Sequence, residues 1–133
     1  MKEKEVELTN ILNSKIKELN LKNTENEFSY YDASNQHYII EYKIRSKHYK
    51  EQFIQVDKLY NLLMIAEHQN KIPVYIVSDP KGIFIYNLNK NKGYFLNSKI
   101  VIKQCPYRTE FKENKKVSKY FYILTNEQLT IKL

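Results

Sequence analysis

The segment YYDASNQHYIIEYKIRSK, residues 30–47, contains the pattern that decides the fold. Its second half, from Tyr38 to Arg45, is rich in β-branched and aromatic residues, which predicts a β-strand. Glu41 and Lys43 interrupt this apolar run. Because side chains alternate between the two faces of a strand, Glu41 and Lys43 share one face, and the opposite face carries Ile40, Tyr42 and Ile44. An acid and a lysine side by side on a strand otherwise suited to burial call for an explanation.

A second acid, Asp32, precedes Glu41 by nine residues. The residues Ala33 to Gln36 between them are small and polar, so they predict a hairpin turn. An antiparallel hairpin of this length can bring the Asp32 carboxylate beside Glu41. Two carboxylates and a backbone carbonyl are oxygen ligands suited to Mg²⁺. With Lys43 nearby to position water or balance charge, these residue types match metal-assisted hydrolysis of a phosphodiester.

The rest of the chain predicts a single α/β domain with a central mixed sheet flanked by helices. Amphipathic spacing predicts helices from Lys2 to about Leu21 and from Lys50 to Gln69, the second with an apolar face made of Phe53, Val56, Tyr60, Leu63 and Met64. The expected strands are Glu27 to Asp32, Tyr38 to Arg45, Val74 to Val77, Ile83 to Tyr86, Tyr94 to Lys103 and Val117 to Thr125. A β-turn is expected at Asp79 to Gly82, and a basic loop at Pro106 to Asn114. The domain spans residues 1–133, with a core at about 3–88 and a β-rich extension at about 94–133.

Composition favours a basic protein of the cytoplasm. The chain has 22 Lys and Arg against 15 Asp and Glu, a net charge of +7, and it attracts polyanions such as nucleic acid. Abundant lysine also follows from an AT-rich coding sequence, so charge alone favours nucleic acid only modestly. One cysteine excludes an intrachain disulfide. No apolar run reaches the ~18–20 residues that cross a bilayer, and the first residues lack the apolar core of a signal peptide.

The stretch YDASNQHYIIEYK resembles the core of the PD-(D/E)XK nuclease superfamily, the restriction-endonuclease-like fold that includes Holliday-junction resolvases. In that superfamily an acid on one strand precedes an acid-x-lysine on the next. The resemblance implies an αβββαβ-type core and a DNA endonuclease. It also implies Mg²⁺, with Mn²⁺ able to substitute, held by Asp32, Glu41 and the Tyr42 carbonyl, and a catalytic role for Lys43. Tyr31 stands where many members have proline.

The same resemblance suggests additional residues. Some resolvase-like members carry a glutamate on the first helix, for which Glu7 and Glu18 are both available and Glu7 is preferred on spacing. Other members carry a glutamine and a tyrosine on the helix after the acid-x-lysine strand, and here Gln52, Gln55 and Tyr60 lie nearby. The residues after the candidate site can grip the phosphate backbone, although solvated charge explains them equally well. They are Arg45, Lys47, His48 and Lys50.

Several alternatives stay open. Glu41 and Lys43 can be a solvated pair on an edge strand. The domain can be a homodimeric endonuclease, because cutting two strands needs two sites, or an inactive module of the same fold that binds nucleic acid or a protein partner. It can also be an interaction protein whose tyrosine-rich strands form a dimer interface. The three histidines have no zinc-like spacing, and two glycines make no phosphate-binding loop.

Overall fold

The computed structural model describes residues 2–25, 29–89, 101–106, 116–124 and 129–131, which form two helices and nine strands. Six strands make a central sheet in the order β1-β2-β3-β5-β6-β9. These strands are β1 (Lys22–Asn23), β2 (Ala33–Ser34), β3 (Tyr38–Ile44), β5 (Ile72–Asp79), β6 (Gly82–Asn87) and β9 (Leu129–Ile131). The fold is mixed α/β, as the sequence predicts. Nowhere in the described ranges does a helix have the length and apolarity to cross a membrane.

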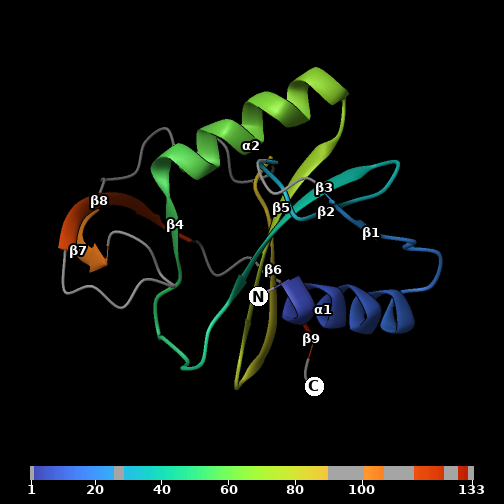
Figure 1. The fold of residues 1–133 in the computed structure, drawn as a ribbon, viewed down its shortest axis with the longest axis horizontal. Coiled ribbons are helices and arrows are strands. Elements are labelled where there is room, and N and C mark those ends of the chain that lie inside the picture. Colours follow the sequence, from blue (N-terminus) through green and yellow to red (C-terminus); the bar gives the residue numbers. More distant parts are fainter. Residues whose placement is uncertain (1, 26–28, 90–100, 107–115, 125–128, 132–133) are drawn as a thin grey trace.

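The centre of this sheet is a parallel pair joined by a helix. Strands β3 and β5 run parallel from Tyr38 opposite Ile72 to Ile44 opposite Ser78, while the other pairs are antiparallel. Helix α2 (Val56–Gln69) makes the crossover, and helix α1 (Lys2–Lys15) covers the other face of the sheet (Figure 1). The expected mixed sheet flanked by helices is therefore confirmed.

Each face of the sheet has its own apolar core. The face under α2 buries Ile39, Tyr75 and Val77 with Leu59, Leu62 and Ala66 of the helix. The face under α1 buries Ile40, Tyr42, Val74, Ile76 and Ile83 with Leu8 and Leu12. This division follows the period-two alternation along β3 and β5. Glu41 and Lys43 consequently lie on the α2 face, in line with the buried Ile39.

The C-terminal segments are part of both sheets. Strand β9 pairs with β6 at the edge of the central sheet. A second, three-stranded sheet has the order β4-β8-β7, built from β4 (Phe53–Gln55), β7 (Val101–Pro106) and β8 (Lys116–Ile123). Strand β4 immediately precedes α2, and Figure 1 shows the second sheet beside the beginning of that helix. The predicted segments at 94–100 and 107–115 lie outside the described residues.

The first helix is shorter than predicted. It ends at Lys15 rather than near Leu21. Glu18 and Asn20 have left-handed backbone conformations, with φ of 63° and 51°, which a continuing helix does not allow. The Asn13 amide also bonds the backbone of Leu21 through both its oxygen and its nitrogen, and this closes the turn. The apolar spacing of Ile16 and Leu19 continues past the helix because both still pack on the core below it.

The hairpin before β3 also differs in detail. Ala33 and Ser34, expected in the turn, form β2 and pair with Ile40 and Ile39. The turn begins at Asn35, whose side-chain oxygen accepts the N–H groups of His37 and Tyr38 at 2.8 Å. No strand forms over the described residues 29–32 of the strand expected from Glu27 to Asp32, and residues 26–28 lie outside the described ranges.

The second helix begins at Val56, six residues later than predicted, because Phe53–Gln55 pair with β8 as strand β4. Its buried face is Leu59, Leu62 and Ala66, whereas Tyr60 and Met64 are 47% and 57% exposed. The predicted apolar face is therefore wrong: the buried face of α2 is rotated from it by part of a turn about the helix axis. The turn at Asp79 to Gly82 forms as predicted: the Asp79 carboxylate accepts the Lys81 N–H at 2.8 Å, and Gly82 has a φ of 141°.

Candidate active site

Asp32 lies directly beside Glu41 because of the register of the β2–β3 hairpin. Ala33 pairs with Ile40, so the next position along each strand places Asp32 opposite Glu41. The Asp32 N–H donates to the Ile40 carbonyl at 2.7 Å, which continues the ladder by one residue. Side chains directly opposite in an antiparallel pair have Cβ atoms about 5 Å apart on the same face. The two carboxyl groups are near enough there for Asp32 to help raise the pKa of Glu41, after the larger effect of burial.

The backbone of Tyr42 belongs to the same edge of β3. Its N–H donates to Asp32 Oδ2 at 2.8 Å, because β2 provides no strand partner this far along. In an extended strand the N–H and C=O of one residue point to the same side. The Tyr42 carbonyl is therefore directed toward the Asp32 side of β3 rather than toward β5. The two carboxyl groups and this carbonyl thus belong to neighbouring positions at the end of the hairpin.

Glu41 carries an unusual charge state for a glutamate. Burial, the charge of Asp32 and the hydrogen bond to Asp32 raise its pKa to about 8, while Lys58 opposes this rise. The Lys58 Nζ lies 3.4 Å from Glu41 Oε1. Two neighbouring carboxylates repel each other unless a proton or a cation offsets their charge. The pair is therefore suited to a hard cation.

Cations surround this acidic pair. Burial lowers the pKa of Lys43, and the charges of Lys58, Arg45 and Lys119 lower it further, whereas Glu41 raises it. Lys58 comes from the first turn of α2 and Lys119 from β8. Positive charges from α2 and from the second sheet therefore act on Lys43. Among the described residues, no group of three or more His, Cys, Asp and Glu side chains could hold a metal ion.

The basic residues after β3 have different environments. Lys47 and Lys50 are exposed. The Arg45 guanidinium lies over the Tyr49 ring, 5.3 Å from its centroid, while its Nε is buried without a hydrogen-bond partner. His48 is fixed on the molecule: its Nδ1 contacts Asp79 Oδ2 at 2.8 Å and its ring lies 5.7 Å from that of Phe84. Only two of the four residues are therefore freely solvated.

Asp79 is a structural residue that sequence reasoning assigned only to a turn. It is 5% exposed and accepts hydrogen bonds from the Lys81 N–H, from Gln52 Nε2 at 3.5 Å and from His48. Gln52 is also buried, and it leads from the basic segment into β4. The signal in the sequence was the apolar run before Asp79, which continues the buried strand to this position.

Glu7 stays the α1 glutamate predicted as an extra ligand. Glu7 is exposed on α1, whose buried residues pack on the sheet face opposite Glu41. Glu18 lies beyond the end of α1 in the loop before β1. Glu5 is the α1 acid whose charge acts on Tyr42 and contributes to raising the pKa of its hydroxyl. Gln55 and Tyr60, considered as partners of the site, line a separate cavity.

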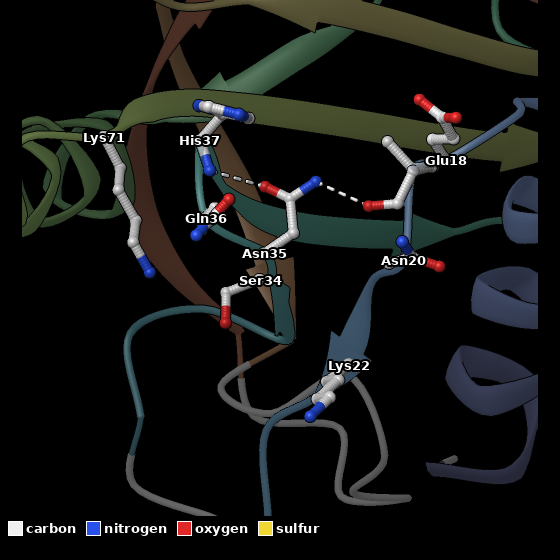
Figure 2. A pocket seen from close by; sticks show the side chains of 9 residues that line it. Glu18, Asn20, Lys22, Ser34, Asn35, Gln36, His37 and Lys71 are labelled. Atoms are coloured by element: carbon white, nitrogen blue, oxygen red, sulfur yellow. Dashed lines mark hydrogen bonds between the residues drawn. The ribbon is translucent and has the colours of Figure 1, made fainter.

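Two hollows of about 570 Å³ each flank the hairpin and α2. One lies between the beginning of α2 and β8 and is called the α2–β8 cavity below. Its lining is Gln55, Val56, Asp57, Tyr60, Asn61, Lys119 and Tyr120. The other lies at the β2–β3 turn, where Figure 2 shows Asn35 bridging His37 and the loop after α1. It is a polar hollow lined by Glu18, Leu19, Asn20, Lys22, Ser34, Asn35, Gln36, His37 and Lys71.

Comparison with known proteins finds similarity among solved structures. No protein-family model matches the chain, and no curated protein matches it significantly. The chain is similar to the structure of Hjc, a Holliday junction resolvase from the archaeal hyperthermophile Archaeoglobus fulgidus. The superposition has a TM-score of 0.48 and 17% sequence identity, and covers 84% of this chain and 76% of that one.

Proposed function

We propose that this protein is a Mg²⁺-dependent endonuclease that hydrolyses phosphodiester bonds of DNA. The observation that carries the proposal is the meeting of Asp32 and Glu41 beside the Tyr42 backbone, on a sheet face surrounded by lysines and Arg45. Two neighbouring carboxyl groups, one with a raised pKa, are a place where a hard cation can take the position of a proton. The cations around it match the charge of a DNA backbone.

The proposed ligands are the carboxylates of Asp32 and Glu41 and the carbonyl of Tyr42. The Tyr42 N–H holds the Asp32 carboxylate in place at 2.8 Å, so one ligand is oriented before any ion arrives. Mg²⁺ keeps several waters and needs few protein ligands, which fits a set of this size. When bound, the ion supplies an activated water and neutralises charge on the phosphate oxygens. Mn²⁺ has similar oxygen preferences and is expected to substitute.

Lys43 is the proposed catalytic cation. Its neighbour on the same strand face is Glu41, and the partly buried environment that lowers its pKa makes its proton easier to move than that of a solvated lysine. It can position the attacking water or stabilise the charge that develops on the phosphate oxygens. Arg45, Lys47 and Lys50 are proposed to contact phosphates on either side of the cut. His48 can join them through Nε2, because Nδ1 is held by Asp79.

The test is cleavage of supercoiled, branched and linear DNA by purified protein in Mg²⁺ or Mn²⁺. Glu41→Gln, Asp32→Asn and Lys43→Met should each reduce cleavage by about 100-fold or more. Glu67→Gln, an exposed substitution on α2, is the matched control and should cleave normally. Glu7→Gln tests the α1 glutamate expected from the sequence. No nicking of any DNA by the wild-type protein, or full activity in Glu41→Gln, removes the proposal.

An inactive DNA-binding module is the second candidate. The observation that favours it is the ion pair between Lys58 and Glu41, which supplies a protein cation where the proposal places a metal. Such a module binds DNA with a steep salt dependence and keeps its affinity in Glu41→Gln without cleaving any substrate. A homodimer is proposed for the active form, since it supplies one site per strand, and light scattering at two protein concentrations tests it.

A further inference from the structure

The α2–β8 cavity lies next to the candidate active site through shared elements. Asn61 lines the cavity. On α2 it lies one turn after both Asp57, which also lines the cavity, and Lys58, which contacts Glu41. Residues three or four positions apart are neighbours on a helix surface, so Asn61 is next to both. Lys119 also lines the cavity, and its charge helps to lower the pKa of Lys43, after the larger effect of burial. The cavity is therefore linked to the candidate active site through Lys119 and through the first turns of α2.

The lining has the chemistry of a base-binding site. Tyr60 and Tyr120 are 47% and 53% exposed, so both rings offer apolar surface to a ligand. Aromatic rings of this kind stack on any nucleobase. Gln55 and Asn61 provide amide donors and acceptors for the edge of a base. A volume of about 570 Å³ is within the range of pockets that hold small organic groups.

The charge of the cavity lining favours a base over a phosphate as the occupant. Asp57 lies in the lining, and the Gln55 amide is 3.4 Å from its Oδ2. A carboxylate repels a phosphate but accepts hydrogen bonds from the exocyclic amino groups of cytosine, adenine and guanine. Lys119 in the lining and Lys58 beside it attract the backbone on either side. The cavity is therefore suited to a base, with the phosphates outside.

We infer that the α2–β8 cavity receives an unpaired base of the DNA strand whose phosphate lies at Asp32 and Glu41. The inference rests on the proposed function and narrows its substrate: a base inside a duplex is stacked and paired, so it enters a side pocket only where the DNA is single-stranded, bulged or branched. Fully paired DNA leaves the cavity unused. The protein thus selects DNA with at least one unpaired nucleotide next to the cut.

Binding measured in EDTA tests this without cleavage, so it is independent of whether the protein is a nuclease. The probes are a fluorescent duplex with one unpaired adenine, the same duplex with an abasic residue at that position, and the fully paired duplex. The wild-type protein should bind the unpaired-adenine DNA about tenfold more tightly than either control. Replacing the adenine with 2-aminopurine should give a fluorescence decrease on binding, because the base stacks on tyrosine.

Tyr120→Ala should bring the affinity for unpaired-adenine DNA down to that of the abasic duplex and abolish the fluorescence change, while Tyr120→Phe keeps both. Tyr30→Ala is the matched control, since Tyr30 is 52% exposed and does not line the cavity. Equal affinity for all three DNAs, or equal losses in Tyr30→Ala and Tyr120→Ala, overturns the inference. Base preference without cleavage in Mg²⁺ overturns the nuclease proposal alone, and absence of DNA binding overturns both.

Discussion

Lys58 and Glu41 form an ion pair, 3.4 Å between Nζ and Oε1, that joins the first turn of α2 to the middle of β3. The Lys58 side chain is half exposed, whereas that of Glu41 is largely buried beside Asp32. Lys58 therefore brings a positive charge from the solvent side to this acidic pair. The charge of Lys58 lowers the pKa of Glu41, against the effects of burial and Asp32. Lys58 therefore keeps the pKa of Glu41 lower than burial and Asp32 alone would make it.

Removing that cation should raise the pKa of Glu41 above its value of about 8. Lys58→Met keeps the length of the side chain and removes the charge. Carbon-detected NMR titration of the Glu41 carboxyl group measures the effect, and Lys47→Met, which changes an exposed lysine outside the ion pair, is the control. A titration midpoint that is unchanged or lower in Lys58→Met contradicts the assigned role of the ion pair.

Glu41 should make metal-free protein less stable at alkaline pH. Its folded pKa of about 8 lies above the unfolded value of 4.5, so the stability that this proton contributes is fully present below pH 4.5 and is lost as the pH rises through 8. Glu41→Gln cannot ionise. Its free energy of unfolding should therefore exceed that of the wild-type protein by about 1 kcal/mol or more at pH 8.5, and the gap should shrink toward pH 5. Urea unfolding in EDTA at several pH values measures it, and a gap independent of pH counts against the raised pKa.

Asp79 should be among the costliest polar residues to replace. Asp79→Ala leaves the Lys81 N–H, the Gln52 amide and the His48 ring without their acceptor in a buried place, a loss of about 2–4 kcal/mol. Asp79→Asn retains the shape and one oxygen acceptor, so its loss should be smaller. Thermal or urea unfolding compares the two variants with the wild-type protein. Equal stability of Asp79→Ala and wild type would show that this network contributes nothing.

Lys47 and Lys50 should contribute charge to DNA binding without contributing to folding. Each exposed lysine that contacts a phosphate adds about 0.9 to the slope of log affinity against log salt. Lys47→Ala and Lys50→Ala should each reduce the slope by about that amount and leave the unfolding free energy within about 0.5 kcal/mol. Lys4→Ala on α1 is the control on the other side of the sheet. If the slope is unchanged in both Lys47→Ala and Lys50→Ala, these lysines do not contact DNA phosphates.

The sequence was most informative where burial is strongest. The alternation along β3 correctly placed Glu41 and Lys43 on one face, and the apolar run at β5 identified a strand buried on both sides. The proximity of Asp32 to Glu41 also follows from the short hairpin. The exact position of the turn could not be predicted from the sequence. Ala33 and Ser34 have no strand preference of their own and become a strand only by pairing with β3.

Long-range pairing set the features that local patterns missed. Phe53–Gln55 continue the apolar spacing of α2, and only their pairing with β8, far along the chain, makes them a strand. Lys119, whose charge acts on Lys43, stands on the same strand, so no local pattern could have named it. Lys58 was within reach of sequence reasoning, since an exposed lysine in the first turn of a crossover helix lies near the strand that the helix covers.

The pairing of β4 with β8 also has a consequence for synthesis. On the ribosome, β4 and α2 emerge together with β3, but the strand that covers β4 follows only after about half of the chain has been added. A nascent chain ending before β8 carries the acidic pair without Lys119 and without the Tyr120 wall. Such intermediates can hold the two carboxyl groups together before the side chains of β8 are in place.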